Sequence, residues 1–456
     1  MAGSIHPAKT PGTLDPTFAD GGVLTLPTPE FTGYFTQAIL PLPENKLLIA
    51  MLLPGEPAAI GLAKVDEDGS IDMGFGEAGT GLVDFSIKGL DLDLYQLCAL
   101  SEGGWLVIGQ FSSIDHSGAY VLRYLPDGRL DSSFGEDGVR LLPYRNEPKG
   151  GSQKDGPATF GQRDREPSTQ GPRSSGNKGA SAVVQLDGKI VLPSARYVDG
   201  DPSQWQWVVI RLNPDGSTDD TFNGSGFVVI ELPGIARNPT SVRGAAVQDD
   251  GKVLVCGEYF QDAPASRGVY VMRLDVTGSL DMSFNGGVGV VTVADTNFVY
   301  ANAMALREND GAIVIAGEIW RDQHRHGLMF VLSRDGFFDF SFNGGQPLFS
   351  RLVPQGQDWR RCIWQADGSI LVAGTVGRGV VEAKVFALTA RFNSDGSLDS
   401  TFNGSGFVLF DEDGQYETVE DMVLMSDGRI VVCGLAWLTG PGGPHVGGSW
   451  IVRYLV

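Results

Sequence analysis

The chain has 456 residues, of which 42% are apolar, so it is long enough to bury a large core. Glycine accounts for 63 residues and charged residues for only 20%, a composition that excludes a coiled coil and a fully disordered chain. The net charge of −21 argues against nucleic acid as a partner, because phosphate binding requires a basic surface.

Residues 1–11 form an N-terminal tail without an apolar stretch of the length found in signal peptides. The longest apolar run of the chain, 47–53, is far shorter than a membrane-spanning helix requires. We therefore expect no membrane insertion, and a protein that is cytoplasmic or is exported by a route without a cleavable N-terminal signal.

A short motif that ends in phenylalanine recurs seven times along the chain. The first copy, LDPTF, ends at Phe18, and later copies include LDSSF at Phe134 and LDMSF at Phe284. The copies lie about 60 residues apart, except for a longer gap before TDDTF at Phe222. A second motif, typified by DGKVLVC from Asp250, also occurs seven times. Two motifs that agree on the number of units indicate a solenoid, a propeller or an array.

Each unit shows the pattern of four short strands, which we call a, b, c and d from the inside out. In the fourth unit, residues 243–248 and 252–256 flank Asp-Asp-Gly, and Asp-Gly between apolar runs is a strong hairpin signal. Two further strands begin at Gly268 and Gly289. A four-stranded meander in each of seven units predicts an all-β fold, a seven-bladed β-propeller with antiparallel blades that spans residues 12–456.

The two ends of the chain are predicted to complete one blade together. Strands b and c of the last unit lie at 429–433 and 450–454, and the strand d that is missing there lies at 21–26. We therefore expect velcro closure of the ring by N-terminal strand d with C-terminal strands a–c, which leaves no open sheet edge.

The long gap between motifs holds an insertion, 145–179, between blades 2 and 3. It contains seven Lys or Arg and four Asp or Glu among many Gly, Ser and Pro residues. This composition cannot bury a core, so we expect the insertion to be mobile. It is either a flap over a site on the variable face or a linker without a function of its own.

The repeated turn, such as NPDGSTDD before Phe222, has two interpretations. Oxygen ligands at alternate positions are typical of calcium loops, but the EF-hand spacing and its bidentate Glu are absent. The favoured interpretation is a tight turn in which Asp219 accepts backbone hydrogen bonds and Phe222 fills the gap between blades. We therefore expect no cofactor and keep calcium as the alternative.

The unit N-P-D-G-S-x-D-x-x-F-N-G, at 213–224, resembles the bacterial delta-60 repeat. The resemblance covers almost the whole chain from Gly12 to Val456, outside the insertion. It implies a seven-bladed β-propeller of a family whose function is largely unknown, and it implies no catalytic motif.

Loops that differ between units identify the face on which we expect function. The b–c and d–a loops vary and open on one face, whereas the a–b and c–d turns are nearly the same in every unit. Aromatic side chains, which suit sugar stacking and protein contacts, are frequent in the variable loops of blades 3 to 5. The predicted ligand-binding residues are Trp320, Tyr259, Phe260, Trp359, Arg360, Tyr300 and Arg243.

The favoured function is a non-catalytic binding or interaction module that recognises a protein or a glycan on this face. The interpretation that each aromatic side chain only caps the edge of its own blade stays open. The alternative function is a glycan-cleaving enzyme, a hydrolase or lyase, with acidic residues at the channel mouth.

Two groups of residues are the candidates for chemistry. Glu258 and Glu318 follow strand b at the same position of adjacent blades, and paired carboxylates can do acid–base work on a glycan. Asp322, His324 and His326 are the candidate metal ligands, because alternate imidazoles can bind a metal. For both groups the favoured interpretation is structural, as acceptors of loop hydrogen bonds and as surface histidines.

Overall fold

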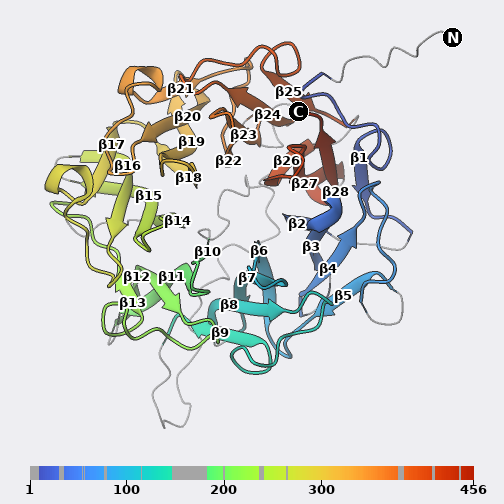
Figure 1. The fold of residues 1–456 in the computed structure, drawn as a ribbon, viewed down its shortest axis with the longest axis horizontal. Helices are drawn as coiled ribbons and strands as arrows, with labels where there is room; N and C mark the ends of the chain where they lie inside the picture. Colours follow the sequence, from blue (N-terminus) through green and yellow to red (C-terminus); the bar gives the residue numbers. More distant parts are fainter. Residues whose placement is uncertain are drawn as a thin grey trace.

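The strands of the molecule form seven four-stranded antiparallel sheets, arranged as blades around a central axis (Figure 1). This computed structural model describes residues 10–29, 35–53, 55, 57–76, 80–114, 116–145, 182–198, 201–235, 241–262, 265–377, 385–412, 416–440 and 443–456. The predicted all-β, seven-bladed propeller is confirmed. The insertion predicted at 145–179 and most of the tail, 1–11, lie outside the described residues, so the mobility of the insertion stays a prediction.

Blades 1 to 3 follow one another along the first half of the chain. Blade 1 comprises β2 (Phe35–Pro41), β3 (Leu47–Leu53), β4 (Ala59–Val65) and β5 (Leu82–Phe85). Blade 2 comprises β6 (Asp91–Ala99), β7 (Trp105–Ser112), β8 (Ser117–Tyr124) and β9 (Val139–Pro143). Blade 3 comprises β10 (Val183–Val184), β11 (Ile190–Val198), β12 (Asp201–Leu212) and β13 (Phe227–Val229).

Blades 4 to 7 occupy the second half. Blade 4 comprises β14 (Ser241–Val247), β15 (Val253–Asp262), β16 (Ala265–Leu274) and β17 (Val290–Asp295). Blade 5 comprises β18 (Val299–Leu306), β19 (Ile313–Arg321), β20 (His324–Leu332) and β21 (Leu348–Ser350). Blade 6 comprises β22 (Arg361–Trp364), β23 (Ile370–Thr375), β24 (Ala387–Phe392) and β25 (Phe407–Phe410). Short 3-10 turns are present at η1 (Pro43–Asn45), η3 (Phe284–Gly287) and η4 (Asn343–Gly345).

Blade 7 closes the ring by combining both ends of the chain. It comprises β26 (Tyr416–Leu424), β27 (Ile430–Gly440), β28 (Gly443–Tyr454) and β1 (Val23–Leu26). Val23 pairs with Val452 and Leu26 pairs with Ser449, in antiparallel register. The predicted velcro closure is therefore confirmed.

The phenylalanine of each repeated turn fills the space between two blades. Phe222, for example, is fully buried in the apolar cluster that joins blades 3 and 4. Its six counterparts occupy the clusters between the other blade pairs, and they are Phe18, Phe75, Phe134, Phe284, Phe342 and Phe402. One buried phenylalanine thus contributes to the apolar core between each pair of neighbouring blades.

The aspartate of the turn holds the chain in place. Asp219 Oδ1 accepts hydrogen bonds from the backbone N–H and the hydroxyl of Thr221, at 3.1 and 2.6 Å. Asp219 Oδ2 accepts a hydrogen bond of 2.6 Å from Arg211 Nε, and the Arg211 guanidinium lies 4.4 Å from the centroid of the Phe222 ring. Burial opposes ionisation, but hydrogen bonds from Thr221, Lys189 and Arg211 lower the pKa of Asp219 to about 2. These contacts are those of a structural turn.

The b–c connections of blades 4 and 5 are shorter than the sequence predicts. In blade 4, β15 and β16 stay paired as far as Asp262 and Ala265, so Tyr259 and Phe260 lie on strands rather than in a loop. The same holds for Trp320, which pairs with Arg325 across β19 and β20. The glycine near the end of the predicted strand b does not terminate the strand, because the hydrogen-bonded ladder continues past it. Along such strands alternate side chains point to opposite faces, which decides which aromatic rings are exposed.

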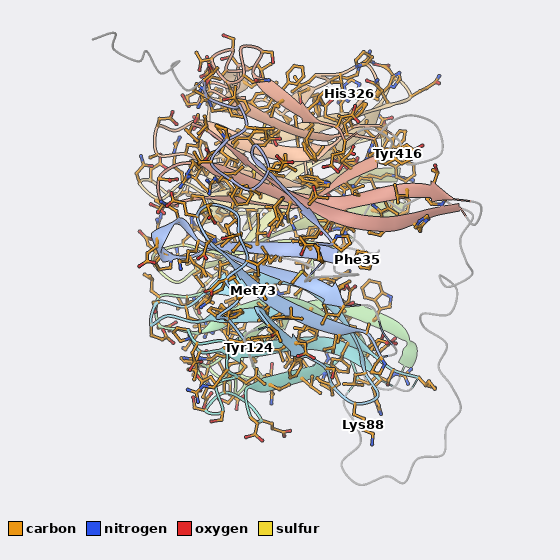
Figure 2. All side chains as sticks on the ribbon, turned by 90° about the vertical axis from the view of Figure 1, so that its right-hand side faces the viewer. Phe35, Met73, Lys88, Tyr124, His326 and Tyr416 are labelled. Atoms are coloured by element: carbon orange, nitrogen blue, oxygen red, sulfur yellow. The ribbon has the colours of Figure 1, made fainter. Side chains whose placement is uncertain are left out.

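The ends of the inner strands identify the face that carries these hairpins. Figure 2 shows the disc edge-on, with Phe35 and Tyr416 toward the face from which the β27–β28 hairpin extends. Both residues begin a strand a, so the d–a connections open on the same face as the b–c hairpins. We call it the variable face.

Candidate functional site

Two of the predicted ligand-binding residues are packing residues in the structure. Trp359 is fully buried, and its Nε1 donates a hydrogen bond of 3.2 Å to Ser350 Oγ. The Tyr259 side chain is 6% exposed and covers the face of Gly268, where a Cβ atom would meet its ring. Neither ring offers a free face for stacking on a ligand, because each is enclosed by its own or the next blade.

Other members of the predicted surface are accessible. Arg267 lies between two rings, 4.9 Å from the centroid of Phe260 and 3.8 Å from that of Phe298, and Phe298 is 52% exposed. Trp320 and Tyr300 are half-buried. The contact surface predicted on blades 3 to 5 therefore stays a prediction, carried by fewer rings than the sequence indicates.

The predicted charged residues lie close together, but they are held in ion pairs. Glu258 accepts hydrogen bonds from Arg243 Nε at 3.0 and 3.1 Å. In blade 5, Arg325 Nη1 lies 3.3 Å from Glu318 Oε2 and 2.7 Å from Asp358 Oδ2, and Asp358 also accepts a hydrogen bond of 3.2 Å from Arg360 Nε.

We call Glu318, Arg325, Asp358 and Arg360 the ion-pair cluster, and its four side chains are at most 15% exposed. Burial raises the pKa of Glu318 despite the attraction of Arg325. Burial acts in the same direction on Asp358, but Arg360 and Arg325 hold the pKa of that carboxyl below its usual value. Sequence reasoning missed Arg325 and Asp358, whose role depends on neighbours in the next blade.

The candidate metal ligands lie on one hairpin. Asp322 and Gln323 form the tight turn between β19 and β20 with positive φ values of 49° and 64°. His324 and His326 follow at alternate positions of β20, and burial together with Arg351 lowers the pKa of His326. Within the described residues, no three His, Cys, Asp or Glu side chains are grouped in a way that could hold a metal ion.

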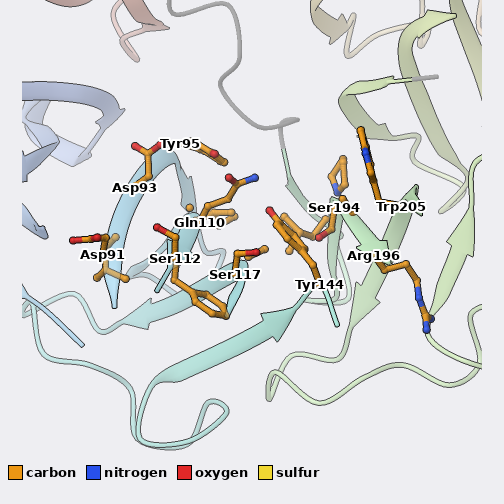
Figure 3. Close-up of a pocket in the computed structure, with 18 of the residues that line it drawn as sticks. Asp91, Asp93, Tyr95, Gln110, Ser112, Ser117, Tyr144, Ser194, Arg196 and Trp205 are labelled. Carbon is orange, nitrogen blue, oxygen red and sulfur yellow. The ribbon is translucent and has the colours of Figure 1, made fainter. Parts of the chain in front are cut away.

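The structure contains a cavity of about 580 Å³ at the variable face, between blades 2 and 3. It lies where β6 begins, where β7 and β9 end, and beside the paired ends of β11 and β12 (Figure 3). Its aromatic and polar lining residues are Asp91, Asp93, Tyr95, Gln110, Phe111, Ser112, Ser117, Tyr144, Ser194, Arg196, Tyr197, Trp205 and Trp207.

The position of Tyr95 follows from a β-bulge in the innermost strand. The register between β6 and β7 shifts between Leu94 and Gln96, which leaves Tyr95 as the extra residue. Opposite the bulge stands Gly109, where a Cβ atom would clash with the backbone oxygen of Asp93. This glycine of strand b thus allows strand a to approach closely. At Gly257 of blade 4, a Cβ atom would clash with the backbone oxygen of Ser241 in the same way.

The wall formed by blade 2 is rich in phenol groups. Burial raises the pKa of Tyr95 and of Tyr144, and the negative charge of Asp93 adds to the shift for both. Tyr144 is also hydrogen-bonded to the side chain of Gln110. Both phenols therefore stay protonated at neutral pH and can donate hydrogen bonds to a ligand.

The opposite wall is formed by blade 3. Tyr197 is the cross-strand partner of Trp205, and Trp205 and Trp207 contact each other edge to face, with ring centroids 5.2 Å apart. Trp205 is 45% exposed, whereas Ser194 is buried and its hydroxyl has no hydrogen-bond partner within the described part of the chain. The cavity thus combines an exposed indole at its rim with polar groups deeper inside.

The sequence analysis did not place Tyr95, Tyr197 and Trp205 in one site. It missed Tyr144 and the two aspartates. The alternation D-L-D-L at 91–94 was a usable signal, because alternate residues of a strand share one face. So was the Pro-Ser at 193–194, which stands where units 2 and 4 to 7 have a residue followed by glycine.

Comparison with known protein families finds one domain. Four segments of the chain, residues 103–134, 185–222, 248–284 and 365–402, match the DUF5122 beta-propeller, a domain of unknown function. Each segment begins shortly before a strand b and ends at the phenylalanine of the repeated turn. The chain is a seven-bladed propeller, and four of its segments are similar to this beta-propeller domain.

Several solved structures are similar in fold. The polysaccharide lyase Uly1 shares 10% identity, with 92% of this chain and 90% of that chain covered and a TM-score of 0.46. A PL25 ulvan lyase bound to -[GlcA(1-4)Rha3S]- shares 14% identity, with 95% and 96% covered and a TM-score of 0.46. A protein of unknown function from Dyadobacter fermentans shares 11% identity, with 97% and 100% covered and a TM-score of 0.38. These similarities extend to the fold alone.

No curated protein sequence matches this chain. Across the residues that the structure describes, no helix has the length and apolar character needed to cross a membrane.

Proposed function

We propose that this protein is a non-catalytic binding protein that takes a glycan in the cavity between blades 2 and 3. The observation that carries the proposal is the lining of the cavity, in which indole and phenol rings stand beside amide, hydroxyl and carboxylate groups. Sugars present apolar faces to aromatic rings and hydroxyl groups to polar side chains, so this combination suits them. The repeats are consistent with a place among the bacterial delta-60 repeat proteins.

The side chains of the cavity support binding rather than catalysis. Asp91 Oδ1 accepts a hydrogen bond of 2.9 Å from the Ala58 backbone N–H, and Asp93 Oδ1 accepts one of 3.0 Å from the Leu94 N–H. The phenols of Tyr95 and Tyr144 have raised pKa values, so they stay protonated at neutral pH and are not available as general bases. The carboxylates considered for the glycan-cleaving alternative, Glu258 and Glu318, are each bound to an arginine.

A glycan array followed by calorimetry on the best ligand tests the proposal. Trp205→Ala should weaken binding by about 1–3 kcal/mol, the scale of a lost aromatic anchor, with little change of the melting temperature because the ring is half exposed. The matched control is Trp320→Ala in blade 5, which should leave the affinity unchanged. If Trp320→Ala weakens binding and Trp205→Ala does not, the ligand occupies blades 3 to 5 and the cavity is not the site.

A further inference from the structure

The charges around the cavity are unequal. Asp91 and Asp93 line one side, and among the described lining residues the single cationic side chain is Arg196. The Arg196 guanidinium lies 4.3 Å from the centroid of the Phe227 ring, and Figure 3 shows this side chain directed away from Gln110 and Tyr144. The lining residues therefore carry two carboxylates and one guanidinium, on a chain whose net charge is −21, and Arg145 lies outside the lining with its guanidinium 4.8 Å from the centroid of the Tyr197 ring.

The aromatic residues of the cavity act in the same direction. The faces of indole and phenol rings carry partial negative charge and attract cations, most strongly where water is excluded. Trp205, Trp207, Tyr144 and Tyr197 line the space beside the two aspartates. Asp93, Tyr95 and Tyr144 line the same cavity, and the negative charge of Asp93 adds to the raised pKa of both phenols.

We infer that the glycan bound in this cavity contains an amino sugar, and that its protonated amine lies between the Asp93 carboxylate and the aromatic rings. The inference rests on the proposed glycan-binding function and names the class of sugar. An ammonium group is a cation and a hydrogen-bond donor, and both properties match carboxylates and ring faces. A uronic acid would instead bring a carboxylate against Asp91 and Asp93, which is unfavourable because like charges repel.

Three tetrasaccharides measured by calorimetry at about pH 6, where an aliphatic amine is protonated, test the inference. The probes are the β-1,4-linked glucosamine tetramer, its fully N-acetylated counterpart and tetragalacturonic acid. We expect the glucosamine tetramer to bind about tenfold more tightly than the acetylated tetramer, and the uronate to bind most weakly. The first two probes share the sugar ring and the linkage, so their ratio isolates the charge of the amine.

A charge-neutralising variant locates the preference. Asp93→Asn should bring the affinity for the glucosamine tetramer down to about that for the acetylated one, a loss of roughly tenfold. The matched control is Asp84→Asn, which removes the same charge from an exposed position of β5 outside the cavity. If Asp84→Asn reduces the ratio as much as Asp93→Asn, the preference reflects the net charge of the protein and the inference is wrong.

The outcomes separate the inference from the function on which it rests. Equal binding of both tetramers, or tightest binding of the uronate, overturns the amino-sugar inference and leaves glycan binding intact. Failure of all three sugars, together with an empty glycan array, overturns the proposed function itself. A trilysine peptide that binds as tightly as the glucosamine tetramer would overturn the amino sugar in favour of a peptide amine.

Discussion

The cavity between blades 2 and 3 and the ion-pair cluster of blades 5 and 6 lie at the same level of the propeller, near the variable ends of the inner strands. Strand a bulges in both halves of the ring, at Tyr95 of blade 2 and at Asn302 of blade 5. The neighbours differ. Asn302 Nδ2 donates a hydrogen bond of 3.0 Å to the backbone oxygen of Trp359, just before the first strand of the next blade, whereas Tyr95 lines a cavity. The same β-bulge thus serves packing in blade 5 and borders a space for a ligand in blade 2. Contacts with the next blade determine which of the two results.

The largest expected effect comes from removing a partner inside the ion-pair cluster. Asp358→Ala would remove the carboxylate that Arg325 and Arg360 share and leave Glu318 as the remaining carboxylate of the cluster, so we expect the free energy of unfolding to fall by about 3–5 kcal/mol. Urea denaturation monitored by tryptophan fluorescence measures it, with exposed Asp84→Ala as the control. A decrease in the free energy of unfolding below about 1 kcal/mol would show that the cluster contributes no more to stability than a surface residue does.

A buried carboxylate without an arginine sharpens the comparison. Glu417 is fully buried, and burial, with Asp411 and Glu412 nearby, raises its pKa to about 8. Because the folded state holds this proton more tightly than the unfolded state, stability is highest below the ordinary glutamate pKa and is lost as the pH rises through about 8.

We expect the free energy of unfolding to fall by roughly 2–4 kcal/mol between about pH 5 and pH 9, and Glu417→Gln to remove most of this slope. Denaturation midpoints across the pH range provide the measurement. The same slope in wild type and in Glu417→Gln would assign the pH dependence to other groups.

The smallest effect concerns a single hydroxyl in the cavity. Tyr144→Phe removes the hydroxyl group that is hydrogen-bonded to Gln110 and can reach a ligand, but it retains the aromatic ring. We therefore expect the glycan affinity to fall by about 1 kcal/mol. Tyr300→Phe is the matched change in blade 5 and should not alter the glycan affinity. Comparable losses in both variants would contradict the difference between the two regions.

The fold was predictable because local signals recur in register. Phenylalanines such as Phe222 fix the period, and Asp-Gly turns fix the hairpins, so seven copies reinforce one another. The sequence even assigns residues 21–26 to the last blade, since a unit without strand d must find one elsewhere.

The site was less predictable because it depends on contacts between blades. The equal positions of Glu258 and Glu318 are visible in the sequence, but their arginine partners are not, since Arg325 lies on the neighbouring strand of the hairpin. Trp359 reads as a loop aromatic, yet it is buried over Gly327 of the preceding blade. Tyr144 enters the cavity from the end of an outer strand, a position that no local pattern identifies.

The pairing of β1 with β28 also dictates the order of events during synthesis. The carboxylate of Asp15 and the guanidinium of Arg453, which meet at 2.9 Å, are 438 residues apart in the chain. At ribosomal rates of about 5–20 residues per second, β1 waits roughly 20–90 s before its partner exists. Blades 1 to 6 can form while the chain grows, but the ring stays open until the final strand arrives. Pairing of β1 with β28, and with it closure of the ring, must therefore wait until β28 has been synthesised.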